Sequence, residues 1–576
     1  MRPLSDRVHP WASCRSRAAM GMNRHSIACQ VPVSRADTAA NRSERSRGPL
    51  RGLAGTVMRL RGAKRRGLAF LAGAVAVVSQ PPFDVPVVLF LSFPVLVWLI
   101  DGADEEDGQD IWRRLMPAFG IGWWFGFGYF VCGLWWLGNA LLIEAEQFAW
   151  ALPFAVFGLP AVLATFYGLA VGLARALWSD GLGRIGALAL GFGLAEWLRS
   201  FVLTGFPWNA IGYGAMPVPL LMQSSAVVGL FGMSALTVFV ASVPALLATR
   251  RGALSGLVLA CALVGAHVAY GSWVLSRVSD DGSGGPVLRL VQPSVDQSMK
   301  WDEAAQNRIF DTLVDLSRAP AEGAAPSLIV WPETAIPFLL TYRPDVLARL
   351  SDVLADGQTL IAGAVREETV APGAWPHYYN AIYVIGDDGR ILEAADKHHL
   401  VPFGEYLPFS ALLERIGLDI IANAPGGFTP GPPRHTVPVP GGLHFLPLVC
   451  YEAIFPHEMA ARGSTADFVI NVTNDAWFGA TPGPYQHFRQ AQLRAVETRL
   501  PLLRVANNGI SAVVDAYGRI LTALPLNAVD YIDAELPEKA NRPLYSLSSL
   551  EFFWIIVFLL AIASVYSRYR FIQRCD

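Results

Sequence analysis

Residues 328–333 have the sequence LIVWPE, in which four apolar residues lead to a proline and a glutamate. A short apolar run that ends at such a break is typical of a buried β-strand. Proline has no N–H to donate to a strand ladder, so Pro332 predicts that the strand ends there and that Glu333 lies in the following turn. The segment therefore predicts a sheet that presents a carboxylate at the end of a strand.

Two further segments share this design. Residues 445–450, FLPLVC, form an apolar run that ends at Cys450, and the strand-like residues 391–396 lead directly to Lys397. Residues at the ends of neighbouring strands can converge on a pocket. We therefore expect a carboxylate, an ammonium group and a thiol to meet at one edge of a sheet.

The surrounding region, residues 280–545, alternates strand-like and helix-like stretches. Asp388-Gly389 and Tyr517-Gly518 indicate hairpin turns. We expect an α+β sandwich with helices covering the β-sheets. Because no Gly-rich phosphate loop, Cys/His cluster or basic-aromatic stripe occurs in the sequence, we expect no cofactor, no metal and no nucleic-acid partner. The expected strands are Val287–Val291, Leu328–Trp331, Thr359–Ala364, Ala381–Ile385, Ile391–Ala395, Phe445–Cys450, Phe468–Val472, Leu502–Val505 and Ser511–Asp515, and the expected helices lie near 302–318, 344–355 and 485–499.

The rest of the chain is far more apolar. Hydrophobic residues make up 53% of the sequence and charged residues 16%, against about 25% charged in soluble domains. The apolar excess lies in residues 67–275, and a membrane-spanning helix needs about 20 such residues. We expect a polytopic α-helical membrane bundle of about eight spans. The expected spans are 67–80, 84–101, 115–141, 148–176, 183–202, 219–248, 253–275 and a C-terminal helix at 551–568.

Basic residues indicate the orientation, because Lys and Arg gather on the cytoplasmic side of membrane helices. With eight spans, all the basic clusters fall on one face of the membrane. We therefore expect a multi-pass protein of a bacterial inner membrane, with both termini in the cytoplasm and residues 280–545 in the periplasm. The clusters contain Arg59, Arg61, Lys64, Arg65, Arg66, Arg113, Arg114, Arg175, Arg184, Arg250, Arg251, Arg568, Arg570 and Arg574.

Residues 1–66 form a basic extension that is rich in arginine and poor in acidic residues. We expect no fold there. One interpretation is a disordered, solvated segment, and another is that translation starts at Met58. An organelle transit peptide has a similar composition, but the remainder of the chain favours a bacterial protein.

Cys450 is the only one of the six cysteines that lies within 280–545. Without a partner in that region it must persist as a thiol. A lone cysteine is often an inert apolar residue of a core, and Glu333 and Lys397 have equally ordinary interpretations as turn and loop residues. As a group, however, the three support acyl transfer through a thioester: the carboxylate can accept the thiol proton, and the ammonium can stabilise an oxyanion.

The sequences around these residues resemble a known superfamily. Trp331-Pro332-Glu333, Asp396-Lys397 and Cys450-Tyr451-Glu452 are similar to the three signatures of the nitrilase superfamily, whose members use a Glu-Lys-Cys triad. Longer strings resemble its membrane branch, the apolipoprotein N-acyltransferases, from about residue 68 to 569. These strings are KHHLVPFGEY at 397–406, NDAWFG at 474–479, QH at 486–487, RVANNG at 504–509 and GFPW at 205–208.

The resemblance implies a nitrilase-like α-β-β-α sandwich and a role for each matched residue. Glu333 would be the general base, Lys397 the oxyanion stabiliser and Cys450 the nucleophile. Glu405 would be a second active-site carboxylate. Two residues, Tyr451 and Glu452, would support the nucleophile, and a third, Trp301, would bind substrate near the entrance. Glu452 could instead cap a helix, and Trp301 could fill space.

The resemblance also implies a reaction. Cys450 would take an acyl chain from a membrane phospholipid, with phosphatidylethanolamine the expected donor, and pass it to the N-terminal amine of a diacylglyceryl-cysteine on an apolipoprotein. We expect a monomer. The apolar segment 403–425, including Phe403, Leu407, Phe409 and Leu412, would shield the thioester from water. Residues 205–208 would be either an interfacial aromatic loop or a loop beside the catalytic mouth.

Two other functions are compatible with parts of the sequence. A membrane-anchored nitrilase or amidase would share the triad and pass the acyl group to water, but eight spans exceed what an anchor needs. A transporter or scaffold would carry ionisable residues inside its spans. The expected spans contain few, chiefly Glu196 and Arg199, so this function is disfavoured.

Overall fold

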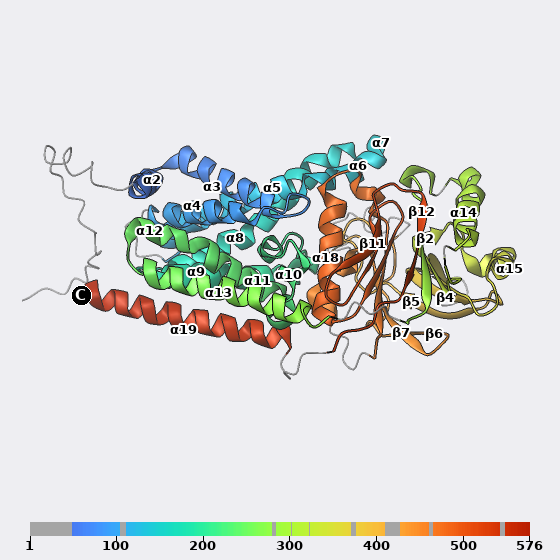
Figure 1. Ribbon diagram of the computed structural model, residues 1–576. Helices are drawn as coiled ribbons and strands as arrows, with labels where there is room; N and C mark the ends of the chain where they lie inside the picture. Colours follow the sequence, from blue (N-terminus) through green and yellow to red (C-terminus); the bar gives the residue numbers. More distant parts are fainter. Residues whose placement is uncertain are drawn as a thin grey trace, which may run out of the picture.

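The computed structural model describes residues 49–103, 111–278, 284–300, 302–321, 323–369, 376–408, 427–459, 465–541 and 548–575. A bundle of helices and a β-sandwich lie end to end, and the C-terminal helix α19 (Ser549–Cys575) returns along the bundle (Figure 1). The basic extension was expected to have no fold, but the structure corrects this for its last part: residues Pro49–Met58 form helix α2, and α3 begins at Gly62. This part folds because Ala54 and Val57 are buried in the core of the helical half. Residues 1–48 and 409–425 lie outside the described residues, so the predictions for them stay untested.

The helical half contains long apolar helices. Within the described part of the chain, five helices are long and apolar enough to cross a membrane: Leu115–Ile143, Ala145–Ala176, Ser225–Thr249, Ala253–Leu275 and Ser549–Arg574. The apolar helix Pro86–Asp101 is shorter, and so are α3 and α9, at 15 and 17 residues. The main helices are α2 (Pro49–Met58), α3 (Gly62–Ala76), α4 (Leu89–Asp101), α5 (Ile111–Leu134), α8 (Leu159–Ala176), α9 (Leu182–Leu198), α11 (Ser225–Ser242) and α13 (Ala253–Leu275), with the short α6 (Gly138–Ile143), α7 (Ala145–Phe148), α10 (Pro219–Met222) and α12 (Leu246–Thr249).

Close helix packing depends on small residues. A Cβ atom on Gly73 of α3 would lie 1.9 Å from the carbonyl oxygen of Phe125 on α5, and one on Gly128 would lie 2.0 Å from the carbonyl oxygen of Phe70. Only glycine permits that approach, as is common between helices in membranes, where packing rather than water exclusion holds helices together. These contacts fix α3 against α5 despite the short length of α3.

The sandwich consists of two six-stranded sheets, ordered β12-β1-β2-β3-β4-β5 and β11-β10-β9-β8-β7-β6. In the first, β1–β2–β3 are parallel, and in the second, β7–β8–β9 are parallel. The strands are β1 (Val287–Gln292), β2 (Leu328–Ile336), β3 (Thr359–Glu368), β4 (His377–Gly386), β5 (Ile391–Asp396), β6 (Val437–Val439), β7 (Leu443–Val449), β8 (Phe468–Thr473), β9 (Leu502–Ala506), β10 (Ser511–Val514), β11 (Ile520–Leu524) and β12 (Asp530–Glu535).

Three apolar layers organise this half. Residues such as Leu290 and Ile470 fill the space between the sheets. Helices α14 (Glu303–Arg318) and α15 (Pro344–Val353) cover the outer face of the first sheet, and α18 (Pro482–Thr498) covers the second. Because α18 also packs against α11, it lies between the sandwich and the helical half (Figure 1). The α-β-β-α order predicted from the sequence is therefore present.

The structure corrects one prediction about β2. The strand does not end at Pro332 but continues to Ile336, so Glu333 lies within it. Its pairing with β3 shifts register between Trp331 and Ile336. A bulge leaves a residue without a ladder partner, so the missing N–H of the proline costs nothing there. All nine predicted strands are present, while the short or polar strands β6, β11 and β12 were missed.

Candidate active site

Cys450 lies at a sharp bend of the backbone. Strand β7 ends at Val449, and the short helix η12 (Cys450–Ile454) begins with Cys450 itself. The φ angle of Cys450 is 51°, a left-handed conformation that is uncommon for residues other than glycine and that clusters at functional sites. The bend therefore holds the thiol at the end of the strand, as the sequence predicted.

Two carboxylates, an ammonium group and an amide form a buried cluster. The Nζ atom of Lys397 lies 2.9 Å from Oε1 of Glu405 and 3.6 Å from Oε1 of Glu333. Asn380 of β4 donates from Nδ2 to both carboxylates, at 2.8 Å to Glu333 and 3.0 Å to Glu405. Three of the residues predicted from the sequence, Glu333, Lys397 and Glu405, are thus in direct contact, and Asn380 is a member that sequence reasoning missed.

The charges of this cluster act on the thiol. Burial raises the pKa of Cys450 well above its usual range, Glu333 raises it further, and Lys397 lowers it. Burial favours the neutral amine of Lys397, but Glu405 and Glu333 raise the pKa of Lys397 above its usual value. The resting site therefore holds a protonated thiol, a permanent ammonium group and a carboxylate able to accept the thiol proton.

Glu452 fixes the backbone around the site. Its Oε1 accepts from the main-chain N–H of His398 at 2.9 Å and of His399 at 3.1 Å, and its Oε2 accepts from Val449 at 2.7 Å. Arg434 pairs with Glu452 at 2.7 Å. One carboxylate thus joins the segment after Lys397 to the bend at Cys450. This arrangement fits a supporting role, and it exceeds what a simple helix cap would require.

Tyr451 connects the site to the helical half. Its hydroxyl donates to the carbonyl oxygen of Gly205 at 3.0 Å, and its ring lies 6.4 Å from that of Phe206. Trp208, in the same loop, is 2% exposed and donates to Gln486 of α18. Of the two interpretations of residues 205–208, the loop beside the catalytic residues is the one that these contacts support.

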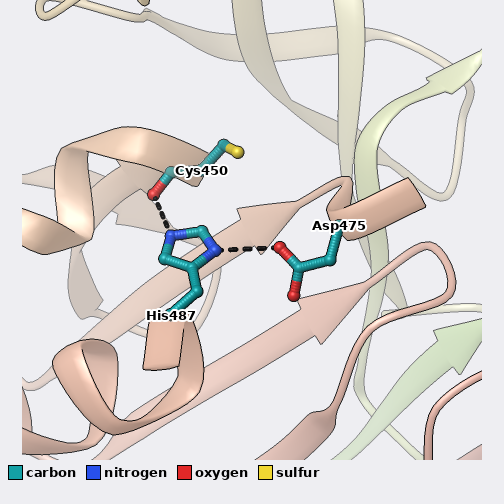
Figure 2. Close-up of side chains that lie close together, drawn as sticks. All are labelled: Cys450, Asp475 and His487. Atoms are coloured by element: carbon teal, nitrogen blue, oxygen red, sulfur yellow. Dashed lines mark hydrogen bonds and ion pairs between the residues drawn. The ribbon is translucent and has the colours of Figure 1, made fainter. Parts of the chain in front are cut away.

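A second polar network lies behind the nucleophile (Figure 2). The Nε2 atom of His487 lies 3.1 Å from the carbonyl oxygen of Cys450, and Nδ1 lies 2.8 Å from Oδ1 of Asp475. Both ring nitrogens thus have partners other than the sulfur of Cys450. His487 therefore supports the backbone of the bend rather than acting as a base on the thiol.

This network has the residue types of a metal site. Donor atoms of Cys450, Asp475 and His487 lie within 4.8 Å of one another. However, Arg504 already donates to Asp475 at 2.8 Å and lies 3.1 Å from Nδ1 of His487. A guanidinium group in that position supplies the positive charge that a cation would bring, so the three residues do not fit a metal.

Two sequence predictions fall partly or wholly outside the described residues. Trp301 is outside them, and so are Phe409 and Leu412 of the predicted shield. Phe403 is described and is 79% exposed. Lys300, which precedes Trp301, is buried beside Glu333 and was missed as a site residue, although a lysine next to a predicted substrate residue was a signal.

Each half of the chain matches a known protein family. Residues 72–243 match the apolipoprotein N-acyltransferase N-terminal domain, and residues 288–542 match the carbon-nitrogen hydrolase family. The protein named apolipoprotein N-acyltransferase of Brucella suis is 58% identical over 90% of this chain and 99% of its own length. The protein of that name from Rhizobium rhizogenes is 52% identical over 91% and 99%.

Among solved structures, an amidase of Nesterenkonia AN1 from the nitrilase superfamily is 20% identical, covers 45% of this chain and 94% of its own, and has a TM-score of 0.33. The extent of the match to the two acyltransferases, across both the helical half and the sandwich, goes far beyond a shared catalytic domain. Because the match is this extensive, the chain belongs to the apolipoprotein N-acyltransferase family.

Proposed function

We propose that this protein moves an acyl chain from a membrane phospholipid to the N-terminal amine of a diacylglyceryl-cysteine on an apolipoprotein. Phosphatidylethanolamine is the donor we expect, and the enzyme acts as a monomer. The observation that carries the proposal is the contact of Lys397 with Glu333 and Glu405, together with the influence of Glu333 and Lys397 on the pKa of the Cys450 thiol. Family membership supports the same reaction.

In the first half-reaction, Glu333 takes the proton of the Cys450 thiol, and the thiolate attacks the ester carbonyl of the phospholipid. Lys397 stabilises the oxyanion of the tetrahedral intermediate. When the C–O bond breaks, Glu333 returns the proton to the leaving alkoxide. The products are a thioester on Cys450 and a lysophospholipid.

In the second half-reaction, the amine of the apolipoprotein attacks the thioester. Glu333 accepts a proton from the amine, Lys397 again stabilises the oxyanion, and the C–S bond breaks. Glu333 then returns that proton to the thiolate of Cys450. Glu405 holds Lys397, and Tyr451 and Glu452 hold the bend at Cys450. In this proposal, Trp301 binds substrate at the entrance of the site.

The membrane placement forms part of the proposal. Residues 67–275 and 551–568 supply eight spans, both termini are cytoplasmic, and the catalytic domain 280–545 is periplasmic. Helix α2 and the C-terminus lie at the same end of the molecule, away from the sandwich (Figure 1). Arg568, in the last part of α19, donates to the carbonyl oxygen of Trp178, Arg251 pairs with Asp180, and α19 packs against α9 and α11. These observations favour an arrangement in which the sandwich faces the outer leaflet.

The decisive experiment is intact-mass analysis of the purified protein after incubation with phosphatidylethanolamine. We expect the mass to rise by one acyl chain in the wild type and in Cys132→Ala and Cys261→Ala, since these two cysteines lie outside the site. Cys450→Ala should gain no mass. An adduct that persists in Cys450→Ala would contradict the proposed nucleophile.

A second step separates transfer from hydrolysis. Adding a diacylglyceryl peptide with a free N-terminus should remove the adduct and yield an N-acylated peptide, whereas the same peptide with an acetylated N-terminus should leave the adduct in place. If the thioester instead decays to free fatty acid at one rate with either peptide, the protein is a hydrolase of the nitrilase type.

A further inference from the structure

A second lysine, Lys300, is buried next to the catalytic residues. It follows the short helix η10 (Gln297–Met299) and is 4% exposed. Its Nζ atom donates to the main-chain carbonyl oxygen of Glu333 at 3.1 Å and to the hydroxyl of Thr334. The proposed mechanism assigns it no role, although its ammonium group contacts the residue that carries the general base.

The contacts of Lys300 are made where strand β2 is irregular. The pairing of β2 with β3 shifts register between Trp331 and Ile336, and Thr334 has a φ angle of 42°. A β-branched residue in this conformation is strained, so neighbouring contacts must hold it. Lys300 donates to both residues of the irregular step and thereby sets the direction in which the Glu333 carboxylate leaves the strand.

The ammonium groups of Lys300 and Lys397 have different partners. Lys397 lies within 3.6 Å of two carboxylates. Among the described residues, Lys300 makes no ion pair, and its two acceptors are a carbonyl and a hydroxyl group. A neutral amide could serve those acceptors without the cost of burying an ammonium group. The positive charge of Lys300 is therefore free to act on the reacting groups.

The groups that face this charge lie on two elements. Burial lowers the pKa of Lys300 to about 8, and Glu333 on β2 and Cys450 on η12 oppose that shift. The same thiol is also influenced by Lys397 after β5 and by Asp475 on η14 (Asp475–Phe478). At neutral pH Lys300 is mostly charged, and it loses its charge as the pH rises through about 8.

We propose that Lys300 is a positioning residue for acyl transfer: it anchors the Glu333–Thr334 step and adds a second positive charge that favours the Cys450 thiolate. The inference rests on the proposed thioester mechanism. When Glu333 removes the thiol proton, negative charge moves to the sulfur. The positive charge of Lys397 is already shared between two carboxylates. Lys300 has no carboxylate partner of this kind among the residues that the structure describes, so its positive charge can attract the negative charge on the sulfur.

The test compares the rate of acyl-adduct formation on Cys450, by intact mass with phosphatidylethanolamine and no acceptor, between pH 6 and 9.5. The wild-type rate should rise less steeply above about pH 8, where Lys300 loses its charge. Lys300→Met should be slower by about tenfold at pH 7, with its profile displaced upward by about one pH unit. Lys539→Met, at an exposed lysine paired with Asp467, is the matched control and should follow the wild type.

Thr334→Val separates the two parts of the role, because it removes one acceptor and leaves the charge. We expect a slower rate at every pH without displacement of the profile. If Lys300→Met and Thr334→Val both keep the wild-type rates and profile, the inference is wrong. If Lys300→Met is not recovered folded, a wild-type rate in Thr334→Val is sufficient to overturn it. A wild type that forms no adduct would overturn the proposed function itself.

Discussion

The two halves of the molecule bury charge in different ways. In the helical half, Glu196 and Arg199 of the α9 region form an ion pair at 2.5 Å with both side chains fully buried. In the sandwich, Lys397 lies among Glu333 and Glu405. Both clusters carry the cost of removing charges from water, yet only the second lies beside a nucleophile.

The cluster in the helical half is closed. Glu196 also accepts from the hydroxyl of Tyr167 at 2.7 Å and from the N–H of Ile211 at 3.0 Å. Arg199 donates to the carbonyl oxygens of Phe206 and Trp208. The pair therefore uses its bonding capacity to fix the loop 205–208. A buried network with this many partners holds a shape.

The cluster in the sandwich is open to a reaction. It has two carboxylates for one fully paired ammonium group, and the adjoining thiol is held neutral by burial and by Glu333. Glu333 also acts on the pKa of the thiol, so a group that can accept a proton and a group that can release one influence each other here. Burial of charge alone therefore does not mark a catalytic site. A catalytic site also needs a neighbouring group that can exchange a proton.

The largest effect is expected from Glu333→Gln, which keeps the shape and an acceptor for Asn380 but removes the base. Adduct formation on Cys450 should fall by about 10²- to 10⁴-fold. The exposed Glu368, which pairs with Arg366, provides the control: Glu368→Gln should keep the wild-type rate. Equal rates in Glu333→Gln and the wild type would assign the base to another residue, with Glu405 the first candidate.

Arg199→Met tests the closed cluster, because it leaves Glu196 buried without its partner. The expected cost is about 3–5 kcal/mol of stability, measured as a lower midpoint of thermal unfolding in detergent. Arg251→Met is the control, since its pair with Asp180 is exposed and should matter by less than about 1 kcal/mol.

The double variant Glu196→Gln/Arg199→Met should be more stable than Arg199→Met alone, because it leaves no unpaired charge. If both variants unfold at the same midpoint, lost packing rather than an unpaired carboxylate explains the effect, and the contrast between the two clusters weakens.

Asp475→Asn tests the network behind the nucleophile. Burial opposes ionisation, but Arg504 and His487 lower the pKa of Asp475 from 3.8 to about 2. A carboxylate with a lowered pKa stabilises the folded state above its unfolded pKa and loses this effect as the pH falls toward the folded value. The wild type should therefore exceed the variant by about 2 kcal/mol at neutral pH. The gap in unfolding midpoints should shrink between about pH 4 and pH 2, and a gap that is constant with pH would assign the cost to packing.

Sequence reasoning found the residues whose position follows from strand ends. Cys450 and Lys397 each follow an apolar strand directly, and their placement was correct. Glu333 was placed in a turn instead of a bulge because a proline has the same signature in either. Asn380 was missed as a site residue because its contacts join elements far apart in sequence, which no local pattern encodes, and Lys300 was missed although it directly precedes Trp301. The sandwich was predictable because alternating strand-like and helix-like runs indicate it, and the α-β-β-α order followed from the resemblance. Edge strands such as β11 carry exposed residues and a weak pattern.

The smallest effect is expected from Tyr451→Phe, which tests whether the two halves are coupled. The variant keeps the ring against Phe206 and removes the hydroxyl that donates to Gly205. One such hydrogen bond contributes about 1 kcal/mol, so adduct formation should slow by less than about tenfold. Because Arg199 holds the same loop from the other side, the effects of Tyr451→Phe and Arg199→Met on the acylation rate should not add. Residues in one network show such coupling. If the effects of Tyr451→Phe and Arg199→Met on the acylation rate are strictly additive in the double variant, the loop 205–208 does not couple the buried Glu196–Arg199 pair to the bend at Cys450. The closed cluster would then stabilise the helical half alone.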